Sequence, residues 1–314
     1  MRILGSILFL ILFVGIGTPA LADVARISTG GAVHQMRGGG TVSMESEIVK
    51  IKISEHLQEI DCTFNFKNKG PACSVRVGFP DFTNIPNLTN EETATNIKPT
   101  FLSYHWYVDG KESSSELVPA ENDYGGNDDI KLWHASDVQF PANSKITVRA
   151  CYSQLPDLSP TDMQEPIQQF IKVTRYILQT AASWKGAVKK ADIYVTFDKD
   201  VAAAPIKLVS VRHLMNSKVK SSKSWWSQQS ANTVCYSASV RPSVNGQELH
   251  FTLNNLRPTE KDDLLFLYQP MSVGKANDYT HYSDRVLSER KTVGVQVSTP
   301  WVFRNAKPNS THKN

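Results

Sequence analysis

The chain of 314 residues carries 34 basic and 30 acidic side chains, and its formal net charge of +4 is too small and too scattered to indicate a nucleic-acid partner. Charged residues make up 20% of the sequence, which excludes an extensively disordered chain and favours a globular one. The length suffices for one large domain or two ordinary ones.

The first 22 residues have the pattern of a secretory signal peptide. Arg2 precedes an apolar run over residues 3–16, followed by Pro19 and by small residues up to Ala22. The run is shorter than the roughly 20 residues of a membrane-spanning helix, so an uncleaved anchor is the less favoured alternative. We expect cleavage after Ala22 and a secreted or periplasmic protein without a transmembrane segment.

A glycine-rich leading segment, residues 23–40, precedes a first block of expected strands. It lacks the lysine and following helix of a phosphate-binding loop. From residue 47 apolar positions alternate with Lys50 and Lys52, the period-two pattern of a half-buried strand. Further strands are expected at 58–66, 73–79, 101–109, 130–140 and 144–153. We interpret residues 41–154 as a first β-sandwich.

A proline-rich linker is expected at 155–168, before a second block of strands. These strands are predicted at 169–179, 190–198, 205–214, 233–241, 247–253 and 263–269. Asn245-Gly246 predicts a hairpin turn. We interpret residues 169–272 as a second β-sandwich, and residues 273–314 as a partly disordered C-terminal extension with a short helix at 275–292. The expected fold is thus all-β, with two antiparallel β-sandwich domains and little helix.

Four cysteines lie in the exported part, where they can be oxidised. Cys62 and Cys73 fall on strand faces that point into the same core, whereas Cys151 and Cys235 share faces with polar neighbours. We therefore favour a Cys62–Cys73 disulfide, with Cys151 and Cys235 bonded to each other or reduced. The alternative is that all four are small buried residues without a bond.

The sequence lacks the motifs of common catalytic and metal sites. It has no His-Glu-x-x-His, Gly-x-Ser-x-Gly, Cys-x-x-Cys or Walker loop, and its eight histidines have no i, i+2 or i, i+4 spacing. A triad assembled from distant positions stays open. We expect no cofactor and lean towards a protein that is not an enzyme.

The acidic loop at 121–134 is the strongest candidate for a metal site. Asp123, Asp128 and Asp129 place oxygen ligands around a Gly-Gly turn, an arrangement that suits calcium. The loop lacks the ligand spacing and terminal glutamate of an EF-hand, so we favour a solvated acidic turn.

Tryptophans suggest two candidate ligand surfaces. Exposed aromatic rings on a β-sandwich can stack on sugars, and lysines beside a tryptophan pair attract anionic surfaces. The candidates are Trp106 and Trp133 in the first block, and Trp225, Trp226, Lys220 and Lys223 in the second. The alternative for the adjacent pair is structural, with one ring in the core and one at its rim.

Several phrases resemble an uncharacterised family of bacterial exported proteins that carry a domain of unknown function. The phrases are Thr-Gly-Gly at 29–31, Met-x-Ser-Glu at 44–47, Asn-x-Gly-Pro at 68–71, Gly-Phe-Pro at 78–80 and Trp-Lys-Gly at 184–186. The resemblance spans roughly residues 28–270. It implies a fold and an exported location, but no activity or catalytic residue.

We therefore expect an exported β-sandwich protein that acts as a non-enzymatic binding or structural module of the periplasm or cell exterior. Envelope polysaccharide or protein is the expected partner. The alternative is a carbohydrate-active or other hydrolytic enzyme of the envelope. Histidine and carboxylate side chains converging in a cleft would favour the enzyme.

Overall fold

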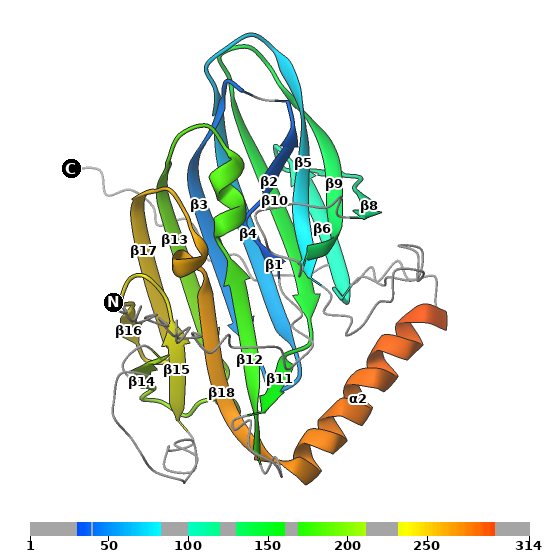
Figure 1. Ribbon diagram of the computed structural model, residues 1–314, viewed down its shortest axis with the longest axis vertical. Coiled ribbons are helices and arrows are strands. Elements are labelled where there is room, and N and C mark those ends of the chain that lie inside the picture. The colour runs from blue at the N-terminus through cyan, green and yellow to red at the C-terminus, as the bar shows by residue number, and fades with distance from the viewer. Residues whose placement is uncertain are drawn as a thin grey trace, which may run out of the picture.

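The computed structural model describes residues 30–38, 40–82, 100–119, 130–160, 169–211 and 232–292. These residues are mostly β-structure, arranged in three sheets (Figure 1), so the expected β-rich class is confirmed. The predicted signal peptide at 1–22 and the residues from 293 onwards lie outside the described residues.

The largest sheet has eight strands in the order β16-β17-β13-β3-β4-β10-β6-β7. Their bounds are β16 (Ser243–Asn245), β17 (Glu248–Leu256), β13 (Val188–Phe197), β3 (Val42–Ile53), β4 (Gln58–Asn68), β10 (Lys145–Gln154), β6 (Ser103–Val108) and β7 (Lys111–Ser113). This sheet takes strands from both halves of the chain, because β3 pairs in parallel with β13. The expected division into two separate sandwiches is therefore not confirmed.

Two smaller sheets face the large one. The six-stranded sheet has the order β1-β12-β18-β15-β14, with β11 also paired to β12, and the four-stranded sheet has the order β2-β5-β9-β8. The first contains β1 (Gly30–Gly31), β12 (Gln169–Ile177), β18 (Leu264–Ser272), β15 (Thr233–Ser237), β14 (Lys207–Ser210) and β11 (Asp157–Pro160). The second contains β2 (His34–Arg37), β5 (Cys73–Phe82), β9 (Ile130–Phe140) and β8 (Glu116–Pro119).

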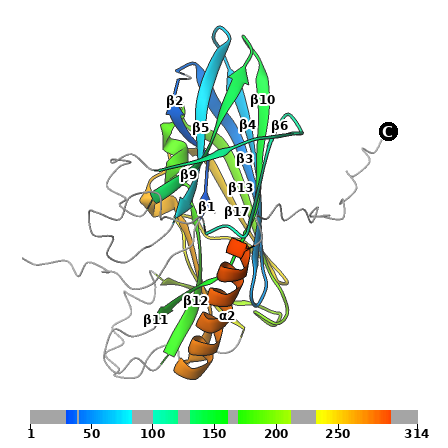
Figure 2. The same ribbon diagram turned by 90° about the vertical axis from the view of Figure 1, so that its right-hand side faces the viewer.

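The small sheets cover different parts of the same inner face (Figures 1 and 2). Phe197 of β13 packs on Tyr268 of β18 with 5.7 Å between ring centroids, which places the six-stranded sheet over β13. Phe79 of β5 packs on Tyr152 of β10 at 5.1 Å, which places the four-stranded sheet over β10. One continuous hydrophobic core fills the space between the layers.

Strands β4 and β5, which correspond to the expected strands at 58–66 and 73–79, do not pair with each other. They belong to different sheets, and the chain turns a corner from one sheet to the other after Asn68. The buried amide of Asn68 holds this corner by donating to the carbonyl oxygens of Pro71 at 2.7 Å and Pro141 at 3.0 Å. The same polar loop chemistry suits a hairpin and a corner, so the sequence pattern could not separate them.

The expected Cys62–Cys73 disulfide is wrong, since all four cysteines are free thiols. Cys62 lies in the middle of β4 opposite Val49, whereas Cys73 opens β5 opposite Phe140 in the other sheet. The sheet-to-sheet corner therefore separates two positions that a hairpin would have brought together.

The local turn residues predicted the structure more reliably than the strand faces predicted the disulfide. Asn245-Gly246 joins β16 to β17, with Gly246 at a φ of 60°, so the predicted hairpin is confirmed. Gly31 is needed for close approach, because a Cβ there would lie 2.6 Å from the backbone oxygen of Ile177.

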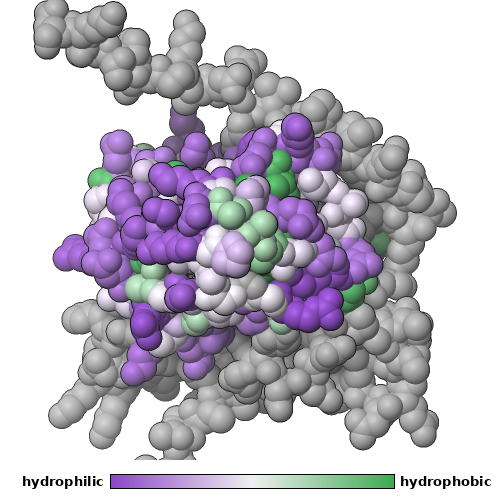
Figure 3. Space-filling view, turned by 90° about the horizontal axis from the view of Figure 1, so that it is seen from above, coloured by the Kyte–Doolittle hydropathy of each residue, from purple (hydrophilic) through white to green (hydrophobic). Residues whose placement is uncertain are grey.

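The single α-helix among the described residues, α2 (Val273–Thr292), follows β18 and contains the whole of the predicted helical segment 275–292. It packs on the sheets through Ala276 and Tyr279, whose hydroxyl donates to the Pro156 oxygen at 2.6 Å. No helix within the described ranges is long and apolar enough to cross a membrane. Seen from above, the described surface is mostly hydrophilic, with less polar residues near its centre (Figure 3).

Candidate functional site

The two tryptophans predicted to form a ligand surface in the first half are part of the interior. Trp106 is 2% exposed and Trp133 is 0% exposed. Trp106 occupies an inward position on β6 opposite Ala150, and Trp133 lies on β9 opposite Pro80. Trp106 belongs to the main core between the sheets, whereas Trp133 lies on the other face of its sheet in a separate buried cluster with Ile177, so neither ring is open to a ligand.

The other predicted site residues fall outside the described part of the chain. They are Trp225, Trp226, Lys220 and Lys223 of the basic-aromatic segment, and Asp123, Asp128 and Asp129 of the acidic loop. Among the residues that the structure describes, no group of three or more histidine, cysteine, aspartate or glutamate side chains could hold a metal ion.

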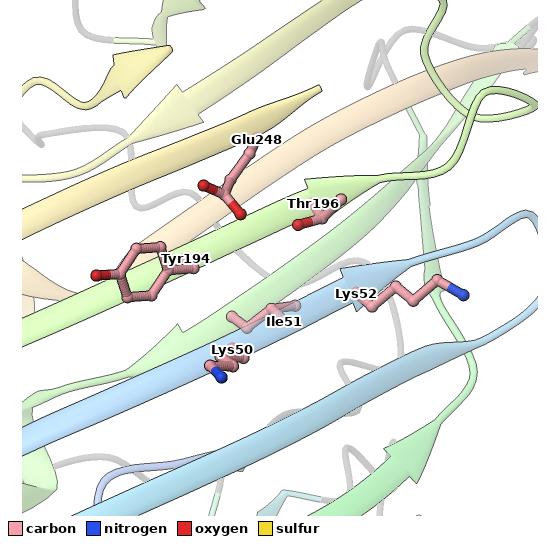
Figure 4. A pocket seen from close by; sticks show the side chains of 6 residues that line it. All are labelled: Lys50, Ile51, Lys52, Tyr194, Thr196 and Glu248. Carbon is pink, nitrogen blue, oxygen red and sulfur yellow. The ribbon is translucent and has the colours of Figure 1, made fainter. Parts of the chain in front are cut away.

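The solvent-facing side of the eight-stranded sheet is hollowed where β3, β13 and β17 run side by side. The hollow has a volume of about 380 Å³ and is lined by Lys50, Ile51, Lys52, Tyr194, Thr196 and Glu248 (Figure 4). We call this feature the outer-face hollow. Ile51 is 2% exposed and belongs to the core face, so the hollow's side-chain chemistry comes from the other five residues.

Strand register explains why these residues meet. Lys50 of β3 is opposite Tyr194 of β13, which is in turn opposite His250 of β17. The next outward row contains Lys52, Thr196 and Glu248 in the same strand order. Alternate residues of a strand share one face, so two adjacent rows from three strands form the wall and floor of the hollow.

The charged groups of the hollow differ in how they are paired. The ammonium of Lys52 lies 3.6 Å from Glu59 and 3.6 Å from Asp198, and it points away from the other lining groups (Figure 4). Lys50 and Glu248 form no ion pair with any described residue. The hollow thus contains one cation and one anion that form no ion pair within the described part of the chain.

A hydrogen-bonded cluster beside the hollow positions Tyr194. Asp192 accepts hydrogen bonds from Lys190 at 2.7 Å and from the Thr252 hydroxyl at 3.0 Å, and it contacts His250 Nε2 at 3.2 Å. The His250 ring lies parallel to the Tyr194 ring, with 4.2 Å between centroids. Burial alone would raise the pKa of Asp192, but these hydrogen bonds lower it below the ordinary value.

This cluster does not have the geometry of a catalytic triad. A triad histidine uses one ring nitrogen for the carboxylate and the other for the nucleophile. Here Nε2 of His250 contacts both Asp192 and the Thr252 hydroxyl, each at 3.2 Å. The same nitrogen cannot hold the carboxylate and activate the hydroxyl.

A second histidine-carboxylate pair is buried between β5 and β9. His134 Nε2 lies 3.2 Å from Asp81, which is 0% exposed and also accepts the backbone N–H of Thr100 at 3.0 Å. The His134 ring stacks on Tyr104 with 3.9 Å between centroids. Asp81 thereby connects β5 to His134 of β9 and to the backbone of Thr100.

No family model matches the sequence, and no curated protein matches it. The fold is similar to the crystal structure of a proposed nutrient binding protein from Legionella pneumophila, with a TM-score of 0.52 and 14% identity over 78% of this chain and 71% of that chain. An M1 zinc metallopeptidase from Deinococcus radiodurans gives a TM-score of 0.32 and 10% identity over 75% of this chain and 43% of that chain, which is too low to support an argument. At such identities the first likeness concerns the fold alone.

Sequence reasoning placed Lys50 and Lys52 on the outward face of a strand but did not identify the hollow. Tyr194 and Thr196 lie at the outward positions of the predicted 190–198 strand, so their exposure could have been read from the alternation. Their meeting with Lys50 depends on the parallel pairing of β3 with β13, for which the sequence carries no local signal.

Proposed function

We propose that the protein is an exported binding protein that takes a small polar molecule in the outer-face hollow. The hollow itself is the observation that carries this proposal. Its volume of about 380 Å³ falls in the range of small-molecule sites, which begins near 300 Å³. Export, to the periplasm or the cell exterior, rests on the signal-like first 22 residues and on the resemblance to an exported family.

The position of the hollow favours binding. Its side chains project from three hydrogen-bonded strands, so the ligand groups need little ordering when a molecule binds. Tyr194 is further fixed by the parallel ring of His250. The similarity in fold to a proposed nutrient binding protein agrees with a binding role and a small ligand.

A hydrolytic enzyme is the alternative, and the described side chains favour it less. The contact of His250 with Asp192 positions Tyr194, and the buried contact of His134 with Asp81 holds β9 to β5. The contacts of His105 with Glu112 and of His56 with Glu55 are at the surface. Chemical conversion of a bound compound by the protein would instead support a hydrolytic enzyme.

The test is retention of small molecules by the purified chain that begins at residue 23. The protein is mixed with a filtered extract of small polar metabolites, separated by ultrafiltration, and the retained compounds are identified by mass spectrometry. We expect wild-type protein to retain a small set of compounds intact, and the double variant Lys50→Met with Tyr194→Ala to lose them. Equal retention by both proteins would refute the hollow as the binding site, and cleaved products would point to the enzyme.

The matched control is Lys189→Met. Lys189 lies on β13 but does not line the hollow, and its ammonium is paired with Glu45 at 2.7 Å. Its replacement should leave the retained compounds unchanged, whereas a loss equal to that of the double variant would mean that any change of the surface disturbs binding.

A further inference from the structure

We propose that the molecule taken by the outer-face hollow is a small zwitterion with well-separated charges, of the size of a dipeptide. Its carboxylate would bind Lys50 and its ammonium would bind Glu248. This inference rests on the proposed function and names the chemical class of its ligand.

Lys50 is the cation that would bind the carboxylate of the ligand. Lys50 lies directly opposite Asp61 of β4, the natural cross-strand partner for its ammonium. Asp61 instead accepts two hydrogen bonds from Arg149, each at 2.8 Å. This bidentate pair occupies the carboxylate and leaves Lys50 without an anionic partner among the described residues.

Glu248 is the anion that would bind the ammonium of the ligand. Glu248 lies opposite Thr196 of β13 and Asn245 of β16, neither of which is charged. The only other cation of the hollow, Lys52, is held by Glu59 and Asp198. In Figure 4 the carboxylate of Glu248 points towards the side of Thr196 and Tyr194, and the ammonium of Lys52 points the other way.

The distance between Lys50 and Glu248 bears on the size of the ligand. Lys50 and Glu248 are two strands apart and lie in successive outward rows, so their Cα atoms are about 12 Å apart for ordinary strand spacing. A free α-amino acid, whose carboxylate and ammonium are attached to one carbon, would require both long side chains to bend towards each other, whereas a ligand with more widely separated charges would not. A dipeptide separates these groups by a further residue, or about 3.5 Å of extended chain.

The middle of the hollow suits the centre of such a ligand. Tyr194 and Thr196 lie on β13, between the strands that carry the two charged residues, and the Thr196 hydroxyl can exchange hydrogen bonds with a peptide amide, whereas the Tyr194 hydroxyl points away from Lys50 and Glu248 (Figure 4). A dianion would be repelled by Glu248. A neutral sugar would leave both charges without a partner, so charge complementarity favours the zwitterion.

The experiment is titration of the purified chain from residue 23 with dialanine, N-acetyl-dialanine, dialanine amide and free alanine, followed by calorimetry. We expect dialanine to bind at least about fivefold more tightly than each of the other three compounds, the difference expected of one charge-assisted contact. Equal binding of the blocked forms, or no binding of dialanine at concentrations on the order of 10 mM, would overturn the zwitterion.

Two variants assign the ends of the ligand. Lys50→Met should abolish the preference for dialanine over its amide but keep the preference over the N-acetyl form. Glu248→Gln should do the reverse, and the control Lys189→Met, which removes a surface cation that does not line the hollow, should keep both preferences. If either lining variant leaves both preferences intact, the assignment of that end is wrong.

Failure of the zwitterion proposal can be distinguished from failure of the proposed binding function. If ultrafiltration recovers compounds that are not zwitterions, and the hollow variants lose them, the binding role stands and the ligand class is wrong. If dialanine fails and no compound is retained, both proposals are wrong.

Discussion

Lys50 of β3 lies directly opposite Tyr194 of β13, across a parallel pair of strands that joins the two halves of the chain. The outer-face hollow exists because of this pairing. The same pairing gives β3 a neighbour on each side, since β4 lies along its other edge. The candidate site and the connection between the halves are therefore one feature of the fold.

The shared sheet predicts that the first half does not fold by itself. A fragment of residues 41–154 would leave the edge of β3 unpaired and would expose Val49 and Ile51, both at most 2% exposed in the intact chain. We expect the fragment to show no cooperative transition in urea by circular dichroism, and the chain from residue 23 to show one. A cooperative transition in the fragment would instead support the original division into two sandwiches.

The alternation of apolar and polar residues predicted the strands well, and its limits have a physical cause. A period of two identifies which side chains face the core, as for Val49 and Lys50, but not which strand lies alongside. The hairpin at Asn245-Gly246 could be predicted because a two-residue turn fixes its partner. The corner after Asn68 could not, because its neighbours are set by packing between sheets.

The candidate site could not be predicted for the same reason, because the sequence does not show which strands lie side by side. Tryptophan was chosen by residue type, but Trp106 proved to lie in the main core and Trp133 in a smaller buried cluster with Ile177. The hollow is made of ordinary lysine, tyrosine, threonine and glutamate side chains, each unremarkable in sequence. Only the register of three strands brings them together.

Buried Glu47 predicts an unusual dependence of stability on pH. One oxygen accepts the Tyr176 hydroxyl at 2.5 Å, and the other has no partner among the described residues. Burial raises the pKa of Glu47 from 4.5 to about 7, whereas the Tyr176 hydrogen bond lowers it. The folded state holds this proton more tightly than the unfolded state, so the contribution to stability is complete below pH 4.5 and is lost as pH rises to about 7.

The variant Glu47→Gln keeps the shape and removes the titration. Relative to wild type, its free energy of unfolding should increase by roughly 3 kcal/mol between pH 5 and pH 8, measured by urea denaturation. Glu45→Gln is the control, because the hydrogen bond from Lys189 lowers the Glu45 pKa and gives a small effect of opposite sign. An unchanged difference between wild type and Glu47→Gln at the two pH values would contradict this account.

The free cysteines predict a distinct pattern of thiol reactivity. Cys62 and Cys235 are 0% exposed and Cys151 is 8% exposed, and burial raises the pKa of all three thiols. Cys73 is partly exposed. We expect one thiol to react with Ellman's reagent in the native protein and four in denaturant without reductant. Two reactive thiols in denaturant would reveal a disulfide.

The pair of Asp81 and His134 predicts a large loss of stability on substitution. Asp81→Ala would leave the Thr100 N–H and His134 without their buried acceptor, so we expect about 3 kcal/mol of destabilisation. The control is Asp137→Ala, since the exposed Asp137 pairs with Arg76 at the surface and should contribute less than about 1 kcal/mol. Similar losses for both variants would contradict a structural role specific to the buried pair.

The crystal structure of the chain with a compound recovered by ultrafiltration tests the binding site most directly. We predict electron density for the compound in the outer-face hollow, within hydrogen-bonding distance of Lys50, Tyr194 or Glu248. Density at any other surface, with the hollow holding only water, would contradict the assignment of this sheet face as the binding site.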